Sequence, residues 1–486
     1  MAYKHGVYNT EQATSLTVPI QGSAGLQVIF GTAPIHLAKD PAAAVNTPKL
    51  VYSYKEAVEA VGYSDDFDTF TLCQSISACF QVFNVAPIIL VNVLDPNKAA
   101  HVTQNQAESC DVVDGVVLYD KKYVLLNTLA VKNGSATLVA GSDYEAAHED
   151  DGSVAITLLS AAAKEASSLT VSSTSLKPSG VTAADIVGGV DASTGKETGL
   201  ELIRQIYPTL GMVPGLILAP GWSHTPTVAA ALQAKTENIN GNLNCSCLLD
   251  ISADSDGAVV YTSVKGAKEA LGASSPHAAA LWPMVAVGEK KYYFSAMFAA
   301  LTAYTDANNA DVPYESPSNK DLRITATVLK DGTTVALDQQ QADDVLNANG
   351  VITAVNADGF KSWGNNTAAY PSTTDPKDRW WAVRRFFDWD GNNFIRTYFQ
   401  KVDKPGNKRL IQSIVDSQNI IGNGYVARDY CAGYRVEFRS DENPVTNLLA
   451  GHLTTHTYMA PYIPAEYIEN VREYDVDALE SAIGGE

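Results

Sequence analysis

The sequence predicts a multidomain α/β (α+β) protein, with an α/β sheet core, an inserted all-β module and extended strand-forming arms at both ends. Three observations support this class. Apolar, strand-sized runs alternate with helical patterns on both sides of residues 97–195. Within that segment, short alternating stretches are separated by Asn-Gly, Asp-Gly and Ser-rich turns. Both ends of the chain alternate apolar and polar residues without a nearby partner strand, and 486 residues are enough for two to four domains.

The α/β core is expected over residues 26–96 and 196–325. Its strands are apolar on both faces, which is typical of a mostly buried, parallel sheet. The expected elements, in chain order, are strand Leu26–Phe30, helix Asp68–Phe83, strand Ile88–Leu94, helix Glu197–Ile206, strand Gly215–Ala219, a helix capped by Thr225 with Pro226 at its first position, and strand Cys245–Ile251.

Three further units complete the expected organisation. Residues 97–195 form the inserted β-rich module, which we expect to lie on the outside of the molecule. Residues 326–456 form a C-terminal domain, with helices expected over Gln340–Asn347 and Leu410–Ile421 and from Asn443-Pro444 onward. Residues 1–25 and 457–486 form the two arms.

The arms are candidates for pairing between chains. A strand whose backbone groups lack a partner in its own chain can satisfy them at the sheet edge of a neighbour. Pro19 in the N-terminal arm favours an edge position. The residues expected to pair in this way are Leu16, Val18, Ile20, Tyr458, Tyr462, Ile468 and Val471.

Composition limits the partners. The formal net charge is −20, which disfavours binding to nucleic acid or to anionic membranes. No apolar run is long enough to cross a bilayer and the N-terminus lacks a signal-peptide pattern, so we expect a soluble chain made in a cytoplasm. The six cysteines do not form a disulfide framework and are expected to be core thiols.

Charge is uneven in the last third of the chain. Residues 375–409 hold nine Lys or Arg and five Asp, whereas residues 465–486 hold seven acidic residues and one Arg. The two segments could attract each other, within one chain or between chains, or they could be solvated stretches that never meet.

Each candidate catalytic motif lacks at least one residue that its chemistry requires. The stretch 188–197 lacks both the first Gly and the Ser or Thr of a phosphate loop. Ser223 and His224 lack the second Gly of a nucleophile elbow, and His452 and His456 lack an intervening Glu. Residues 379–387 interleave aromatic residues with arginine, which we interpret as a packed strand with structural arginines. We therefore expect no catalytic, cofactor-binding or metal-binding residue.

Several motifs resemble those of contractile tail sheath proteins, in the same order. The most specific are the Pro-Ser-Asn core at 317–319, the Trp-Gly-x-x-Thr pattern at 363–367, the double arginine at 384–385, and Gly433–Phe438 followed by Asn443-Pro444. The opening residues His5–Tyr8 and Val28–Ala33 also match, so the resemblance covers nearly the whole chain. Trp is missing before Glu315, and the segment 97–195 varies among sheaths.

The resemblance implies a structural role without catalysis. Sheath subunits polymerise as stacked hexameric rings around an inner tube protein, together with baseplate and tail terminator proteins, and contract to drive the tube through a cell envelope. Such a chain is found in a virion tail or a phage-tail-like particle assembled in the bacterial cytoplasm. Charge asymmetry suggests a tube- or neighbour-facing segment with Arg384, Arg385, Lys401, Lys404, Lys408 and Arg409. The alternative is a non-contractile structural or surface protein of similar build.

Overall fold

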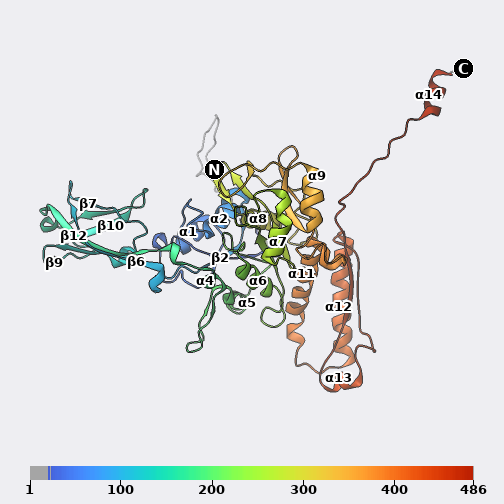
Figure 1. The fold of residues 1–486 in the computed structure, drawn as a ribbon. Helices are drawn as coiled ribbons and strands as arrows, with labels where there is room; N and C mark the ends of the chain where they lie inside the picture. Colours follow the sequence, from blue (N-terminus) through green and yellow to red (C-terminus); the bar gives the residue numbers. More distant parts are fainter. Residues whose placement is uncertain (1–19, 22, 485–486) are drawn as a thin grey trace, which may run out of the picture.

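The computed structural model describes residues 20–21 and 23–484, so the predicted pairing residues Leu16 and Val18 lie outside the described part. The chain forms a central α/β body, a β-rich unit that projects from one side, and a pair of long helices on the other side (Figure 1). A mixed α/β class is therefore confirmed.

An eight-stranded sheet forms the centre of the body, in the order β22-β21-β17-β16-β15-β2-β5-β3. The six inner strands run parallel, and β3 and β22 run antiparallel to their neighbours at the two edges. The strands are β2 (Gln27–Gly31), β3 (Lys49–Val51), β5 (Ile88–Asn92), β15 (Leu216–Leu218), β16 (Ser246–Asp250), β17 (Ala278–Leu281), β21 (Val351–Asn356) and β22 (Phe360–Trp363). Most inner-strand residues are buried because helices cover the sheet.

Two of these strands correct the predicted domain boundary. Strands β21 and β22 come from the segment 326–456, which the sequence assigned to a separate C-terminal domain, yet they complete the core sheet. Strand β20 (Ala326–Val328) also joins the body, by pairing with β18 (Met284–Val287), which in turn pairs with β19 (Lys290–Tyr292). Strand β21 adds to β17 because its buried apolar residues extend the parallel sheet.

Helices cover the sheet at bounds that differ from the expected ones. Helix α2 (Leu72–Ile76) continues into a π-helical stretch, Ser77–Phe83, and so starts later than predicted. The expected helix Glu197–Ile206 begins instead with β14 (Glu197–Thr198), and helix α5 spans Ile203–Leu210. Thr225 holds the N-cap position of α6 (Pro226–Ala234), as predicted, although its side chain makes no capping hydrogen bond. The remaining covering helices are α1 (Tyr54–Val61), α7 (Val264–Leu271) and α8 (Phe294–Asn308), of which α8 is nearly all buried.

The projecting β-rich unit consists of two antiparallel sheets with a hydrophobic cluster of their own. One sheet contains β6 (Val102–Asp111), β12 (Ser168–Leu176), β8 (Ala130–Asn133) and β9 (Ala136–Thr137), and the other contains β10 (Tyr144–His148), β11 (Val154–Leu158) and β7 (Val116–Tyr119). The ring of His148 contacts the ring of His36 in the central body, with 5.2 Å between centroids.

The C-terminal part contains α10 (Pro376–Arg379), α11 (Trp381–Tyr398), α12 (Lys408–Ala427), β23 (Cys431–Glu437), α13 (Val445–Leu449), β24 (His456–Pro461) and α14 (Val476–Ile483). The prediction of a strand around residues 379–387 is wrong, because Arg379 ends α10 and residues 381–387 form the start of α11. No helix among the described residues is long and apolar enough to span a membrane.

Candidate assembly surface

Helix α11 fixes the C-terminal helices to the central body through a buried ion pair. Arg385 on α11 donates to both carboxylate oxygens of Asp306 on α8, and the two side chains are only 3% and 1% exposed. Burial raises the pKa of Asp306, and the guanidinium of Arg385 offsets part of that rise. Arg384 instead donates to Asp378 at 3.2 Å and to Asp388 at 2.9 Å. Both arginines are therefore committed to contacts within the chain, which corrects their expected place on a tube-facing surface.

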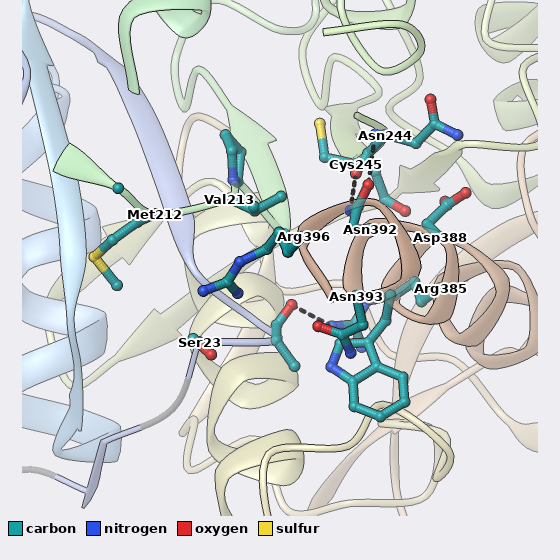
Figure 2. Close-up of a pocket in the computed structure, with 16 residues that line it drawn as sticks. Ser23, Met212, Val213, Asn244, Cys245, Arg385, Asp388, Asn392, Asn393 and Arg396 are labelled. Carbon is teal, nitrogen blue, oxygen red and sulfur yellow. Dashed lines mark hydrogen bonds between the residues drawn. The ribbon is translucent and has the colours of Figure 1, made fainter. Parts of the chain in front are cut away.

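A small cavity of about 120 Å³ lies beside this joint, between α11 and the loops that precede β2, β15 and β16 (Figure 2). Asn392 on α11 closes one side, since its amide accepts from the backbone N–H of Asn244 at 3.0 Å and donates to the carbonyl of Asn244 at 2.6 Å. In α/β sheets, ligands usually bind at the carboxyl ends of the strands, whereas this cavity lies at their amino ends. Its position is that of a contact between α11 and the central body, rather than that of a usual ligand site.

Helix α12 is held to α11 and β23 through the side chain of Tyr434. The Tyr434 hydroxyl accepts from Gln418 at 2.6 Å and donates to Asp390 at 2.9 Å. Burial raises the pKa of Asp390 to about 6, and the hydrogen bond from Tyr434 offsets part of that rise. The Tyr434 ring also covers Gly422, where an added Cβ would lie 1.9 Å from Tyr434 Cδ1. Only a glycine permits α12 to lie this close to the hairpin.

Strands β23 and β24 form a hairpin that lies against α12. Tyr458 pairs with Arg435 in the same chain, which corrects the expectation that this part of the C-terminal segment has no local partner. Among the described residues, the hairpin strands pair only with each other. Each therefore has one edge without a partner strand, at which a further strand can add.

The root of the N-terminal arm is anchored to the central body. Ile20 and Gln21 form β1, which runs parallel to β4 (Val85–Ala86) of the same chain, so Ile20 also has a partner within the chain. Immediately after it, Asp311 accepts hydrogen bonds from the backbone N–H groups of Ser23 and Ala24, both at 2.7 Å. The start of the described chain is thus fixed beside α8.

The C-terminal tail leaves the body at a second anchor. Glu466 accepts from Asn365 at 3.1 Å and from Arg379 at 3.3 Å, and the Arg379 guanidinium lies over Trp380, 4.0 Å from its ring centroid. Beyond this point the chain is extended and runs away from the body to α14 (Figure 1). The predicted pairing residues Ile468 and Val471 are exposed in this stretch, and Tyr462 is exposed just before the anchor.

The basic residues beyond α11 gather at one end of the helix pair, which we call the tip and define as residues 399–409 and 445–453. Gly406 and Leu453 lie side by side there, because a Cβ at Gly406 would be 3.7 Å from Leu453 Cδ1. Of the predicted basic segment, the tip holds Lys401, Lys404, Lys408 and Arg409; Lys401 is partly exposed and the other three are exposed.

Sequence reasoning missed the two anchors, Asp311 and Glu466, and the exposed apolar side chains of the tip. The anchors depend on partners far along the chain, and no local pattern indicates them. The apolar side chains left a weak signal in the sequence, since Val445, Leu448 and Leu449 form a short apolar stretch, but this stretch lies 36 positions after Arg409 and joins the basic residues only in the fold.

The residues considered for catalysis serve the fold. Ser223 is fully buried and donates to Asp250 at 2.7 Å, while Ser295 at the start of α8 donates to the same carboxylate at 2.6 Å. The ring of His224 stacks on the ring of Tyr293, with 5.5 Å between centroids. The stretch 188–197 is the hairpin of β13 (Gly189–Val190) and β14. Among the described residues, no three His, Cys, Asp or Glu side chains are grouped so that they could hold a metal ion.

Comparison with known proteins gives a consistent result. No family model matches the chain. It is 28% identical over 499 aligned residues to the tail sheath protein of Burkholderia phage BcepMu, and the alignment covers 99% of both chains. It is 25% identical to the tail sheath protein of Escherichia phage P2, over 59% of this chain and 69% of that protein.

Solved structures share the fold. A chain of the anti-feeding prophage baseplate superposes with a TM-score of 0.58 at 15% identity, covering 98% of this chain and all of that one. A chain of the PVC sheath complex, an extracellular contractile injection system in its contracted state, gives a TM-score of 0.57 at 13% identity, with 98% and 99% covered. The resemblance noted in the sequence is thereby confirmed: over 99% of its length, this chain is similar to a phage tail sheath protein, and it shares the fold of chains from contractile injection systems.

Proposed function

We propose that this chain is a structural subunit of a contractile tail sheath. It polymerises as stacked hexameric rings around an inner tube protein, between a baseplate and a tail terminator, and contraction of the sheath drives the tube through a cell envelope. The observation that carries the proposal is the similarity to a phage tail sheath protein over 99% of both chains. The chain works in a virion tail or tail-like particle and is not an enzyme.

The geometry of the chain ends supports assembly by strand exchange. Both ends start from fixed anchors, at Asp311 and Glu466, and the hairpin β23–β24 offers edges without a partner strand among the described residues. Extended segments that add to such edges gain main-chain hydrogen bonds and hold subunits together while the subunits rotate. Residues 1–19 and 467–475 are the segments proposed to pair between chains.

Deletion of residues 1–19 tests this role. The described fold begins at Ile20, so the truncated chain should keep the circular dichroism and melting behaviour of the full chain. Electron microscopy should show sheath or polysheath for the full chain and dispersed subunits for the truncated one. Normal sheath formation by the truncated chain would rule out N-terminal strand exchange. As a matched control, Gly-Gly replaces residues Asn133–Ala136, the turn between β8 and β9. This change should leave assembly unchanged, because the turn lies in the projecting unit.

The proposed function requires no nucleotide. Free energy for contraction would be stored in the interfaces of a metastable extended state. Addition or removal of ATP and magnesium should therefore leave the contraction rate of purified particles unchanged, whereas a rate that depends on nucleotide would contradict the proposal.

A further inference from the structure

The last helix, α14, has an apolar stripe that contacts nothing within the described chain. Val476, Leu479 and Ile483 recur at the i, i+3 and i+7 positions of one helix face, and they are 56%, 42% and 76% exposed. Glu480 flanks this stripe and Asp477 lies farther round the helix on the same flank, so the helix is amphipathic and acidic. Helices of this length are marginal in water unless their apolar face is packed.

The tip of the helix pair has the complementary character. Its exposed apolar side chains are Phe399, Val402, Val445, Leu448, Leu449 and Leu453. Its basic residues, Lys401, Lys404, Lys408 and Arg409, outnumber its one acidic residue, Asp403. Within the described residues, none of these four basic side chains forms an ion pair, so their charges are available to a partner.

We propose that α14 of one copy docks on the tip of a second copy, with its apolar stripe against the apolar side chains and its carboxylates among the lysines. This inference rests on the proposed self-assembly of the chain. It adds to strand exchange a separate contact, made by side chains at the far end of the tail.

The tail is long enough to reach a neighbour. Nine residues, 467–475, lie between the Glu466 anchor and the start of α14, so the chain takes ten steps. Extended chain spans up to about 3.3–3.6 Å per step, or roughly 35 Å in all. Figure 1 shows the tail pointing away from its own helix pair, so docking on its own tip would require the tail to turn back on itself. Charge complementarity selects the tip as the docking surface, because opposite charges steer and orient such contacts.

Crosslinking between two copies of different size tests the proposal. One copy carries Ala482→Cys beside the apolar stripe, and a longer, tagged copy carries Asn447→Cys in the tip. Both carry Cys110→Ser, because Cys110 is partly exposed while the other five cysteines are buried. In assembled particles treated with a short bis-maleimide, we expect the mixed-size product. Val190→Cys, an exposed position in the β13–β14 hairpin, replaces Asn447→Cys in the control and should give little product.

Charge reversal adds a second readout. Glu480→Lys should lower the yield of mixed product about tenfold, since it places like charges together, and Lys404→Glu in the partner copy should restore it. Crosslinks confined to single chains, equal yields at positions 447 and 190, or insensitivity to Glu480→Lys would each overturn the proposal. Absence of the product in particles that electron microscopy shows to be ordered would overturn α14 docking and leave the sheath function standing. If no ordered particle forms at all, the proposed function itself fails, and the docking proposal falls with it.

Discussion

The ion pair between Arg385 and Asp306 should be the strongest single polar contact between the C-terminal helices and the central body. Asp306→Ala leaves a guanidinium that is only 3% exposed without its carboxylate partner. Removing one partner of a buried pair typically costs about 3–5 kcal/mol, because the remaining charge is desolvated and uncompensated. With an m-value near 2 kcal/mol per molar urea, a loss of about 3 kcal/mol moves the unfolding midpoint by roughly 1.5 M.

Tryptophan fluorescence can follow this loss, since Trp381 and Trp389 lie on the same helix as Arg385. Urea unfolding of the full chain should show the α11 transition at lower denaturant in Asp306→Ala. The double variant Asp306→Leu with Arg385→Leu should recover most of the loss, because no buried charge remains. Asp441→Ala removes an exposed ion pair with Arg439 and should leave the unfolding midpoint close to that of the unmodified chain, because water screens exposed pairs. A midpoint for Asp306→Ala within the range of this control would refute the reasoning.

Two further predictions concern packing and pH. Gly422→Ala forces a Cβ into the ring of Tyr434 and should lower the free energy of unfolding by about 1–3 kcal/mol. As a control, Gly424→Ala, with no neighbour within 4 Å, should raise it by up to about 1 kcal/mol. Equal effects of the two substitutions in thermal unfolding would contradict the α12–hairpin contact. Burial and the neighbouring His148 lower the pKa of His36 to about 3. Below pH 6.5 the unfolded chain therefore binds a proton at His36 that the folded chain does not bind. The free energy of unfolding should fall by up to about 2 kcal/mol between pH 7.5 and pH 5. His36→Phe should flatten that part of the profile in urea titrations, and an unchanged slope would show that His36 is not the group responsible.

Sequence patterns located the core because its strands are short, apolar and bounded by turn residues. Leu26–Phe30 and Ile88–Leu94 were found within one or two residues for that reason. The segment 379–387 was misread because aromatic residues favour strands, and the helical period of α11 is hidden by polar side chains that are themselves buried, such as Arg385 and Asp388. The interpretation of its arginines as structural was nevertheless correct.

The candidate surface was only partly visible in the sequence. The basic residues at the α11–α12 turn stand out as a local charge excess, but Arg385 finds its partner 79 positions away, and β23 lies next to β24 only in the fold. Local patterns identify charge and period, while the choice between an internal ion pair and an exposed contact depends on tertiary packing.

Cryo-electron microscopy of this chain, produced together with the tube protein of the same tail, tests the central claim most directly. The account predicts a six-fold helical sheath around the tube, with segments 1–19 and 467–475 paired to neighbouring chains, and a shorter, wider sheath after a contraction trigger. Dispersed subunits beside bare tubes, or a sheath whose length never changes, would contradict it.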